Sequence, residues 1–129
     1  MLDIQHIAKT FNPGAITEKI ALRDLSLHLD PGDFVTVIGG NGAGKSTLMN
    51  SIAGTFFADR GTIRVDGEDI TRWPEHRRAK YIGRVFQDPM MGTAAGMMIE
   101  ENLAIAQRRG RTPSLRWSAP KSDRQKFRA

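Results

Sequence analysis

The sequence contains no cysteine, which excludes disulfide bridges and any zinc or iron–sulfur site that needs cysteine ligands. It also lacks a long apolar run, because no segment approaches the roughly 20 residues that a membrane-spanning helix requires. The N-terminus, Met-Leu-Asp-Ile-Gln-His, has neither the charged nor the apolar region of a secretory signal peptide. These absences predict that the 129 residues form one small domain in the cytosol or on the cytosolic side of a membrane.

Acidic residues are almost missing from one end of the chain. Residues 108–129 contain eight lysines and arginines but a single acid, Asp123, which gives this segment a net charge of +7. The remainder of the chain is slightly acidic, so the high isoelectric point comes from this segment. Its prolines and serines interrupt any hydrophobic periodicity and predict a loop-rich structure.

Glycine, by contrast, is concentrated in one short segment. Residues 39–47 read Gly-Gly-Asn-Gly-Ala-Gly-Lys-Ser-Thr and contain the pattern G-x-x-x-x-G-K-[ST]. Glycine lets a backbone fold tightly around an anion, because no Cβ blocks positive φ angles or close approach. The pattern predicts a loop that binds nucleotide phosphates, with Lys45 on the β- and γ-phosphates and the Ser46 hydroxyl on Mg²⁺. The alternative is an ordinary glycine-rich turn between a strand and a helix.

The flanks of this segment favour the phosphate loop. Residues 34–38 are apolar and β-branched, which predicts a buried strand before the loop. Residues 45–53 carry apolar side chains at helical spacing, and Gly54 can end that helix. The other predicted elements are strands over residues 2–8, 25–29, 62–65 and 82–86, a hairpin turn at residues 66–67, a short helix over residues 74–80, and a helix over residues 97–108 with an apolar face of Ile99, Leu103 and Ala106.

Three features, in order along the chain, resemble the N-terminal half of the nucleotide-binding subunit of ABC transporters. Phe11 follows the first strand at the position where that family stacks an aromatic ring on adenine. The glycine-rich segment comes next, and residues 84–89, Arg-Val-Phe-Gln-Asp-Pro, resemble the family's Q-loop. The resemblance covers residues 2 to about 107. It implies an α/β fold, namely a P-loop NTPase core with an N-terminal antiparallel β subdomain.

The resemblance also implies ATP and Mg²⁺ as cofactors. The residues that it places on ATP are Phe11, Gly39, Asn41, Gly42, Ala43, Gly44, Lys45, Ser46, Thr47 and Gln87, and those that it places on Mg²⁺ are Ser46 and Gln87. Two of these positions have plainer alternatives. Phe11 could be a core residue that caps the first strand, and Gln87 could be an ordinary polar residue at a strand end.

By the same resemblance, residues 88–107 dock a transmembrane permease subunit. Met90 and Met91 are the candidates for this interface, whereas Met97 and Met98 fit a core or an interface equally well. A second nucleotide-binding subunit completes a dimer, and the protein is placed on the cytoplasmic side of the cell membrane. No nucleic-acid partner is expected from the family likeness.

Hydrolysis of ATP needs further groups that the sequence does not contain. In the family, an Asp ends an apolar strand, holds Mg²⁺ and precedes a catalytic Glu. The nearest case is Ile63-Arg64-Val65-Asp66, which Arg64 interrupts, and no Ser-Gly-Gly-Gln signature is present. We therefore expect residues 1–107 to be the N-terminal part of the domain, cut before the Walker B strand, and residues 108–129 to begin the next segment. Such a fragment has no catalytic residue of its own and binds nucleotide without turning it over.

Two other functions are compatible with parts of the sequence. The basic segment 108–129 could contact nucleic-acid phosphates in a nucleotide-dependent ABC ATPase. A small-molecule kinase would share the phosphate loop, but such kinases usually begin with the phosphate-loop strand itself. The hairpins that precede the loop, and Gln87, argue against the kinase.

Overall fold

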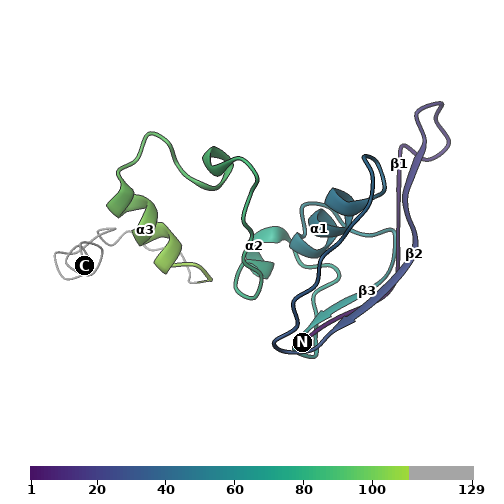
Figure 1. Cartoon of the computed structure of the whole chain (residues 1–129), viewed down its shortest axis with the longest axis horizontal. Helices are drawn as coiled ribbons and strands as arrows, with labels where there is room; N and C mark the ends of the chain where they lie inside the picture. Colours follow the sequence, from purple (N-terminus) through teal and green to yellow (C-terminus); the bar gives the residue numbers. More distant parts are fainter. Residues whose placement is uncertain (111–129) are drawn as a thin grey trace. The chain divides into compact units, whose positions relative to one another are not determined.

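The computed structural model describes residues 1–110 of the chain (Figure 1). The chain divides into two compact units, Met1–Tyr81 and a second unit that begins at Ile82. The predicted basic segment 108–129 lies outside the described residues from position 111 onward. The predicted boundary after residue 107 therefore stays a prediction.

The first unit is built on a four-stranded antiparallel sheet with the order β2-β1-β3-β4. Figure 1 shows the two helices of this unit on one side of the strands. The antiparallel β subdomain predicted from the sequence is thus confirmed. The elements of this unit are β1 (Leu2–Phe11), β2 (Lys19–Leu29), α1 (Lys45–Ala53), β3 (Arg60–Val65), β4 (Glu68–Asp69) and α2 (Glu75–Arg78).

A small apolar core holds these elements together. Ile4 and Ile7 of β1 are both buried although they are three residues apart, a spacing that would place them on opposite faces of a regular strand. A register shift between them, with His6 at φ 52°, restores Ile7 to the core face. The other buried apolar residues are Leu22, Leu48, Ala53, Ala58, Ile63, Ile70 and Ala104, the last of which belongs to the second unit.

Local sequence signals fix two elements of the first unit accurately. Helix α1 ends where Gly54 adopts a left-handed conformation and donates its N–H to the Asn50 carbonyl, as the glycine predicted. The hairpin between β3 and β4 turns at Asp66 and Gly67, both of which have positive φ angles. Helix α2 is shorter than predicted and covers one turn, with Pro74 as its N-cap.

The predicted strand over residues 34–38 does not form. These residues pair with no segment of the described chain, and the side chains of Phe34 and Ile38 are 94% and 90% exposed. Side-chain pattern favours a strand here, but a strand also needs a neighbour for its backbone N–H and C=O groups. Residues 82–86, likewise predicted as a strand, are irregular for the same reason.

The second unit contains a 3₁₀ turn, η1 (Pro89–Gly92), and helix α3 (Ile99–Gln107). The Glu101 carboxylate accepts a hydrogen bond from the Met98 N–H at 2.9 Å and caps the start of α3. The helix predicted over residues 97–108 is confirmed in its main part, and Ile99, Leu103 and Ala106 are exposed, whereas Ala104 is its buried residue. No helix within residues 1–110 is long and apolar enough to cross a membrane.

A histidine on the outer surface of the sheet predicts a pH-dependent stability. Asp3, whose Oδ1 lies 3.3 Å from His28 Nδ1, raises the pKa of His28, and Asp30 adds to this effect. Because the folded-state pKa is raised, the interaction stabilises the fold below the ordinary value of about 6.5 and is lost as the pH rises through the raised pKa. We expect His28→Asn to lower the melting temperature near pH 5.5, about one unit below the ordinary pKa, but not near pH 8.5, about two units above it. In an Asp3→Asn background the same substitution should show a smaller pH dependence, and an unchanged one would contradict this assignment.

Candidate nucleotide-binding site

The glycine-rich segment forms a loop that leads directly into helix α1. The first hydrogen bond within the helix is donated by the Leu48 N–H to the Gly44 carbonyl at 3.2 Å. The N–H groups of residues 45–47 therefore have no acceptor inside the helix, and no acidic side chain lies in the first turn. Free N–H groups and the positive end of the helix dipole make this helix start a site for an anion.

Two glycines of the loop are required by its backbone conformation. Gly42 and Gly44 have φ angles of 83° and 76°, in the left-handed region that favours glycine. At Gly44 the space is also closed, because a Cβ atom would collide with the carbonyl oxygen of Ala21 in β2. The loop therefore approaches the strand backbone more closely than any residue with a side chain allows.

This close approach predicts a stability difference between two glycine substitutions. We expect Gly44→Ala to lower the free energy of unfolding by about 2 kcal/mol or more, because left-handed backbone strain costs about 1–2 kcal/mol and the collision with Ala21 adds to it. Gly40→Ala is the matched control, since a Cβ there meets nothing within 4 Å and φ is not positive. Urea unfolding of both variants measures the difference, and equal stabilities would contradict the assigned loop geometry.

A pocket of about 250 Å³ opens over this loop. Pockets that enclose a whole small molecule usually measure about 300–1,000 Å³, so this one fits part of a ligand, such as a polyphosphate. Its lining includes two lysines and, among the described residues, no carboxylate. The pocket is therefore positively charged. Its lining residues are Lys19, Gly40, Asn41, Gly42, Gly44, Lys45, Ser46 and Thr47.

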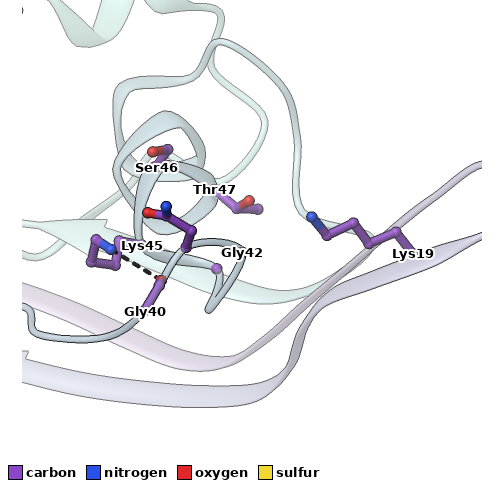
Figure 2. A pocket seen from close by; sticks show the side chains of 8 residues that line it. Lys19, Gly40, Gly42, Lys45, Ser46 and Thr47 are labelled. Atoms are coloured by element: carbon purple, nitrogen blue, oxygen red, sulfur yellow. Dashed lines mark hydrogen bonds between the residues drawn. The ribbon is translucent and has the colours of Figure 1, made fainter.

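The Lys45 ammonium is held at one side of the loop. Its Nζ donates hydrogen bonds to the carbonyl oxygens of Gly39 at 2.7 Å and Gly40 at 3.2 Å, the second of which is drawn in Figure 2. An ammonium group has three donors, so one remains for a ligand. Figure 2 also shows the side chains of Ser46 and Thr47 on the first turn of α1, beside the loop.

The donor set fits Mg²⁺ that arrives together with a nucleotide. Magnesium prefers oxygen ligands and is usually bound through one or two protein groups plus substrate phosphates. Ser46 offers a hydroxyl oxygen at the pocket. Within residues 1–110 no group of three or more histidine, aspartate or glutamate side chains could hold a metal ion on its own.

The other predicted site residues do not line this pocket. Gly39 and Ala43 belong to the loop but do not line the pocket. Phe11, at the end of β1, is half-buried and packs edge-on against Phe56 with ring centroids 5.2 Å apart. Gln87 is exposed and lies in the second unit. Contact of Phe11 and Gln87 with a nucleotide therefore stays a prediction.

Two residues of the pocket are missing from the predicted site residues, namely Gly40, which lies within the glycine-rich segment, and Lys19, which lies outside it. Lys19 is the first residue of β2, and its side chain extends toward the loop in Figure 2. The sequence places it 20 residues before the phosphate loop, within a turn region that carries no motif. Only its pairing with Phe11 across the β1–β2 ladder could have suggested a place near the site.

Comparison with known proteins bears on the family. The sequence profile of the ABC transporter family matches residues 22–128, which include the whole phosphate loop. The chain belongs to the ABC transporter family.

The tyrosine transport ATP-binding protein of Clostridioides difficile is 40% identical to this ABC chain over 90% of the chain and 46% of the relative. The spermidine/putrescine import ATP-binding protein of Bacteroides thetaiotaomicron is 34% identical over 88% of the chain and 22% of the relative. The ribose import ATP-binding protein of Streptococcus agalactiae is 38% identical over 82% of the chain and 20% of the relative. The ABC chain thus spans about half the length, or less, of these curated relatives.

Solved structures support the same fold. A nucleotide-free ATP-binding cassette of an ABC transporter superposes on the chain with a TM-score of 0.72 and 32% identity. This similarity covers 99% of the ABC chain and 51% of the cassette. A dimeric cassette in a post-hydrolysis state, bound to ADP and Pi, gives a TM-score of 0.77 at 22% identity, which supports the fold alone. It covers 97% of the chain and 53% of the cassette. The predicted P-loop NTPase fold is thereby confirmed.

Proposed function

We propose that the chain is the nucleotide-binding part of an ABC transporter ATP-binding subunit, which couples ATP binding and hydrolysis to the transport of a small solute. The observation that carries this proposal is the loop at the start of α1. It combines unpaired helix N–H groups, two left-handed glycines and two lysines around one pocket. Membership of the ABC transporter family supports the same function.

Different groups of the loop would bind different parts of the ATP molecule. The backbone N–H groups at the helix start bind phosphate oxygens, and the third donor of Lys45 binds the β- and γ-phosphates. The Ser46 hydroxyl, with Gln87, would hold Mg²⁺, which neutralises negative charge on the phosphate oxygens. Phe11 would stack on the adenine. In this proposal the full set of nucleotide-contacting residues is the one predicted from the sequence, namely Phe11, Gly39, Asn41, Gly42, Ala43, Gly44, Lys45, Ser46, Thr47 and Gln87.

Two protein partners complete the proposed function. A permease subunit in the membrane would dock on residues 88–107, where Met90, Met91 and Met98 expose apolar side chains. A second nucleotide-binding subunit would form the dimer, at the cytoplasmic side of the membrane. The relatives are named for tyrosine, polyamines and ribose, so the family alone does not determine the solute.

A nucleotide titration tests the proposal. The chain, with Mg²⁺ present, is titrated with a fluorescent ATP analogue while circular dichroism verifies that it is folded. We expect saturable binding that unlabelled ATP displaces, and no phosphate release, because the catalytic carboxylates of the family have no counterpart in the sequence. A folded chain without affinity for ATP at millimolar concentration would refute the proposed function. Phosphate release by this chain would refute the expectation that the chain binds ATP without hydrolysing it.

A further inference from the structure

We propose that Lys19 binds the α-phosphate end of the bound nucleotide and so contributes equally to the affinity for ATP and for ADP. This inference rests on the proposed function and extends it to a residue outside the glycine-rich segment. It starts from the position of Lys19 in the sheet. Lys19 opens β2 and is paired with Phe11 of β1, so the two side chains leave the sheet on the same face.

The Lys19 side chain bridges from the sheet to the phosphate loop. It lines the pocket together with Gly40, Asn41 and Gly42. A Cβ atom built on Gly42 would lie 3.8 Å from the Lys19 Nζ, so the ammonium is in reach of any group bound against this part of the loop. Figure 2 shows Lys19 and Lys45 approaching the loop from opposite sides.

The charge of Lys19 is not neutralised by its surroundings. Within residues 1–110 its ammonium takes part in no hydrogen bond or ion pair. The neighbouring Glu18 carboxylate instead accepts a hydrogen bond from the Gly14 N–H at 2.6 Å, within the turn between β1 and β2. Other lysines of this unit have partners, as Lys9 does in Asp59 at 2.7 Å. An uncompensated ammonium beside a phosphate loop attracts an anion.

The positions of the two lysines assign them to different phosphates. Lys45 is held at Gly39 and Gly40, and takes the β- and γ-phosphates. Lys19 lies on the Gly42 side and next to Phe11, where the adenine is proposed to stack. The phosphate nearest to the nucleoside is the α-phosphate. Because ATP and ADP share this group, a contact to it cannot distinguish between the two nucleotides.

Equilibrium binding of both nucleotides tests this assignment. We expect Lys19→Met to raise the dissociation constants of ATP and ADP by the same factor, about three- to tenfold, since one exposed charge-assisted contact is lost. Lys19→Arg should bind both nucleotides nearly as well as the unmodified chain. The matched control is Arg23→Met, which removes one positive charge from an exposed position of the same strand outside the pocket. Melting temperatures show whether each variant is folded.

Chemical footprinting gives a second readout that does not depend on a substitution. Lysines are acetylated with an amine-reactive reagent, with and without nucleotide, and quantified by mass spectrometry of the peptides. We expect ATP and ADP to protect Lys19 equally, and to leave Lys80 unprotected. The proposal is overturned if Lys19→Met changes neither affinity, if it weakens ATP alone, or if Arg23→Met has the same effect. If the unmodified chain binds no nucleotide, the proposed function fails first and the role of Lys19 fails with it.

Discussion

Substitution of Lys45 by alanine is expected to remove most of the affinity for ATP and to leave the fold intact. In the proposed site the remaining donor of the ammonium would form a charge-assisted hydrogen bond to the β- and γ-phosphates, and such a bond contributes about 1.5–3 kcal/mol. We therefore expect the dissociation constant to rise by about 10- to 100-fold or more. The measurement is a titration with a fluorescent ATP analogue, checked by displacement with unlabelled ATP.

The stability of this variant should change little. Within residues 1–110 the Lys45 ammonium donates hydrogen bonds only to the carbonyls of Gly39 and Gly40, and water can replace it there. Lys80→Ala is the matched control, because Lys80 is an exposed lysine of the same unit whose ammonium lies over the Tyr81 ring, away from the pocket. ATP binding by Lys45→Ala at the level of the Lys80→Ala control would remove the basis of the proposed function. A loss of binding that came with a large drop in melting temperature would point to unfolding instead.

The sequence predicted the phosphate loop and helix α1 well because their signals are local. A glycine in the left-handed region begins the helix at Gly44 and another ends it at Gly54, and both follow from their own backbone requirements. The turn at Asp66 and Gly67 is local in the same sense. At these positions the preference of a few adjacent residues determines the conformation.

The predictions of strands over residues 34–38 and 82–86 were wrong because strand formation depends on pairing with distant segments. Their apolar, β-branched residues suit a buried strand, but within residues 1–110 no neighbouring strand supplies hydrogen bonds to them. In doubly wound α/β sheets the strand before a phosphate loop lies in the centre of a parallel sheet. The exposed apolar side chains of Phe34 and Ile38 therefore mark a surface that such neighbours would cover. We expect these exposed apolar side chains to favour aggregation.

The positions of the Lys19 and Arg78 side chains could not be predicted from the local sequence. Arg78 follows His76 and Arg77 in a run of basic residues that indicates a solvated helix. The structure instead buries Arg78, which is 1% exposed, and leaves Arg77 outside with its guanidinium over the Trp73 ring. No local pattern tells which of two adjacent arginines points inward, because the difference comes from carbonyl groups of distant segments.

The buried Arg78 joins three segments of the first unit through four backbone carbonyls. Its guanidinium donates to Ser51 and Ile52 at the end of α1 at 2.7 and 2.9 Å, and to Thr71 and Trp73 at 2.8 Å each. Burial lowers the pKa of the guanidinium, but arginine stays protonated in proteins. The positive charge also lies favourably at the C-terminal end of the helix dipole. Arg78 thus fixes the C-terminal end of α1, the helix that begins at the glycine-rich loop.

We expect Arg78→Met to lower the free energy of unfolding by about 3–5 kcal/mol, because four backbone carbonyls at least partly buried lose the charged donor that Arg78 supplies. This is a large share of the roughly 5–15 kcal/mol that stabilises a domain. Arg77→Met, its exposed neighbour, should cost about 1 kcal/mol or less. Urea unfolding of both variants measures the difference. Arg78→Lys keeps the charge but loses the planar set of donors, so its loss of free energy of unfolding should fall between those of the two methionine variants. Equal costs for the two methionine variants would contradict the structural role of Arg78. In contrast to Lys45→Ala, the folded fraction of Arg78→Met should still bind ATP, because the loop residues proposed to contact the phosphates are unchanged.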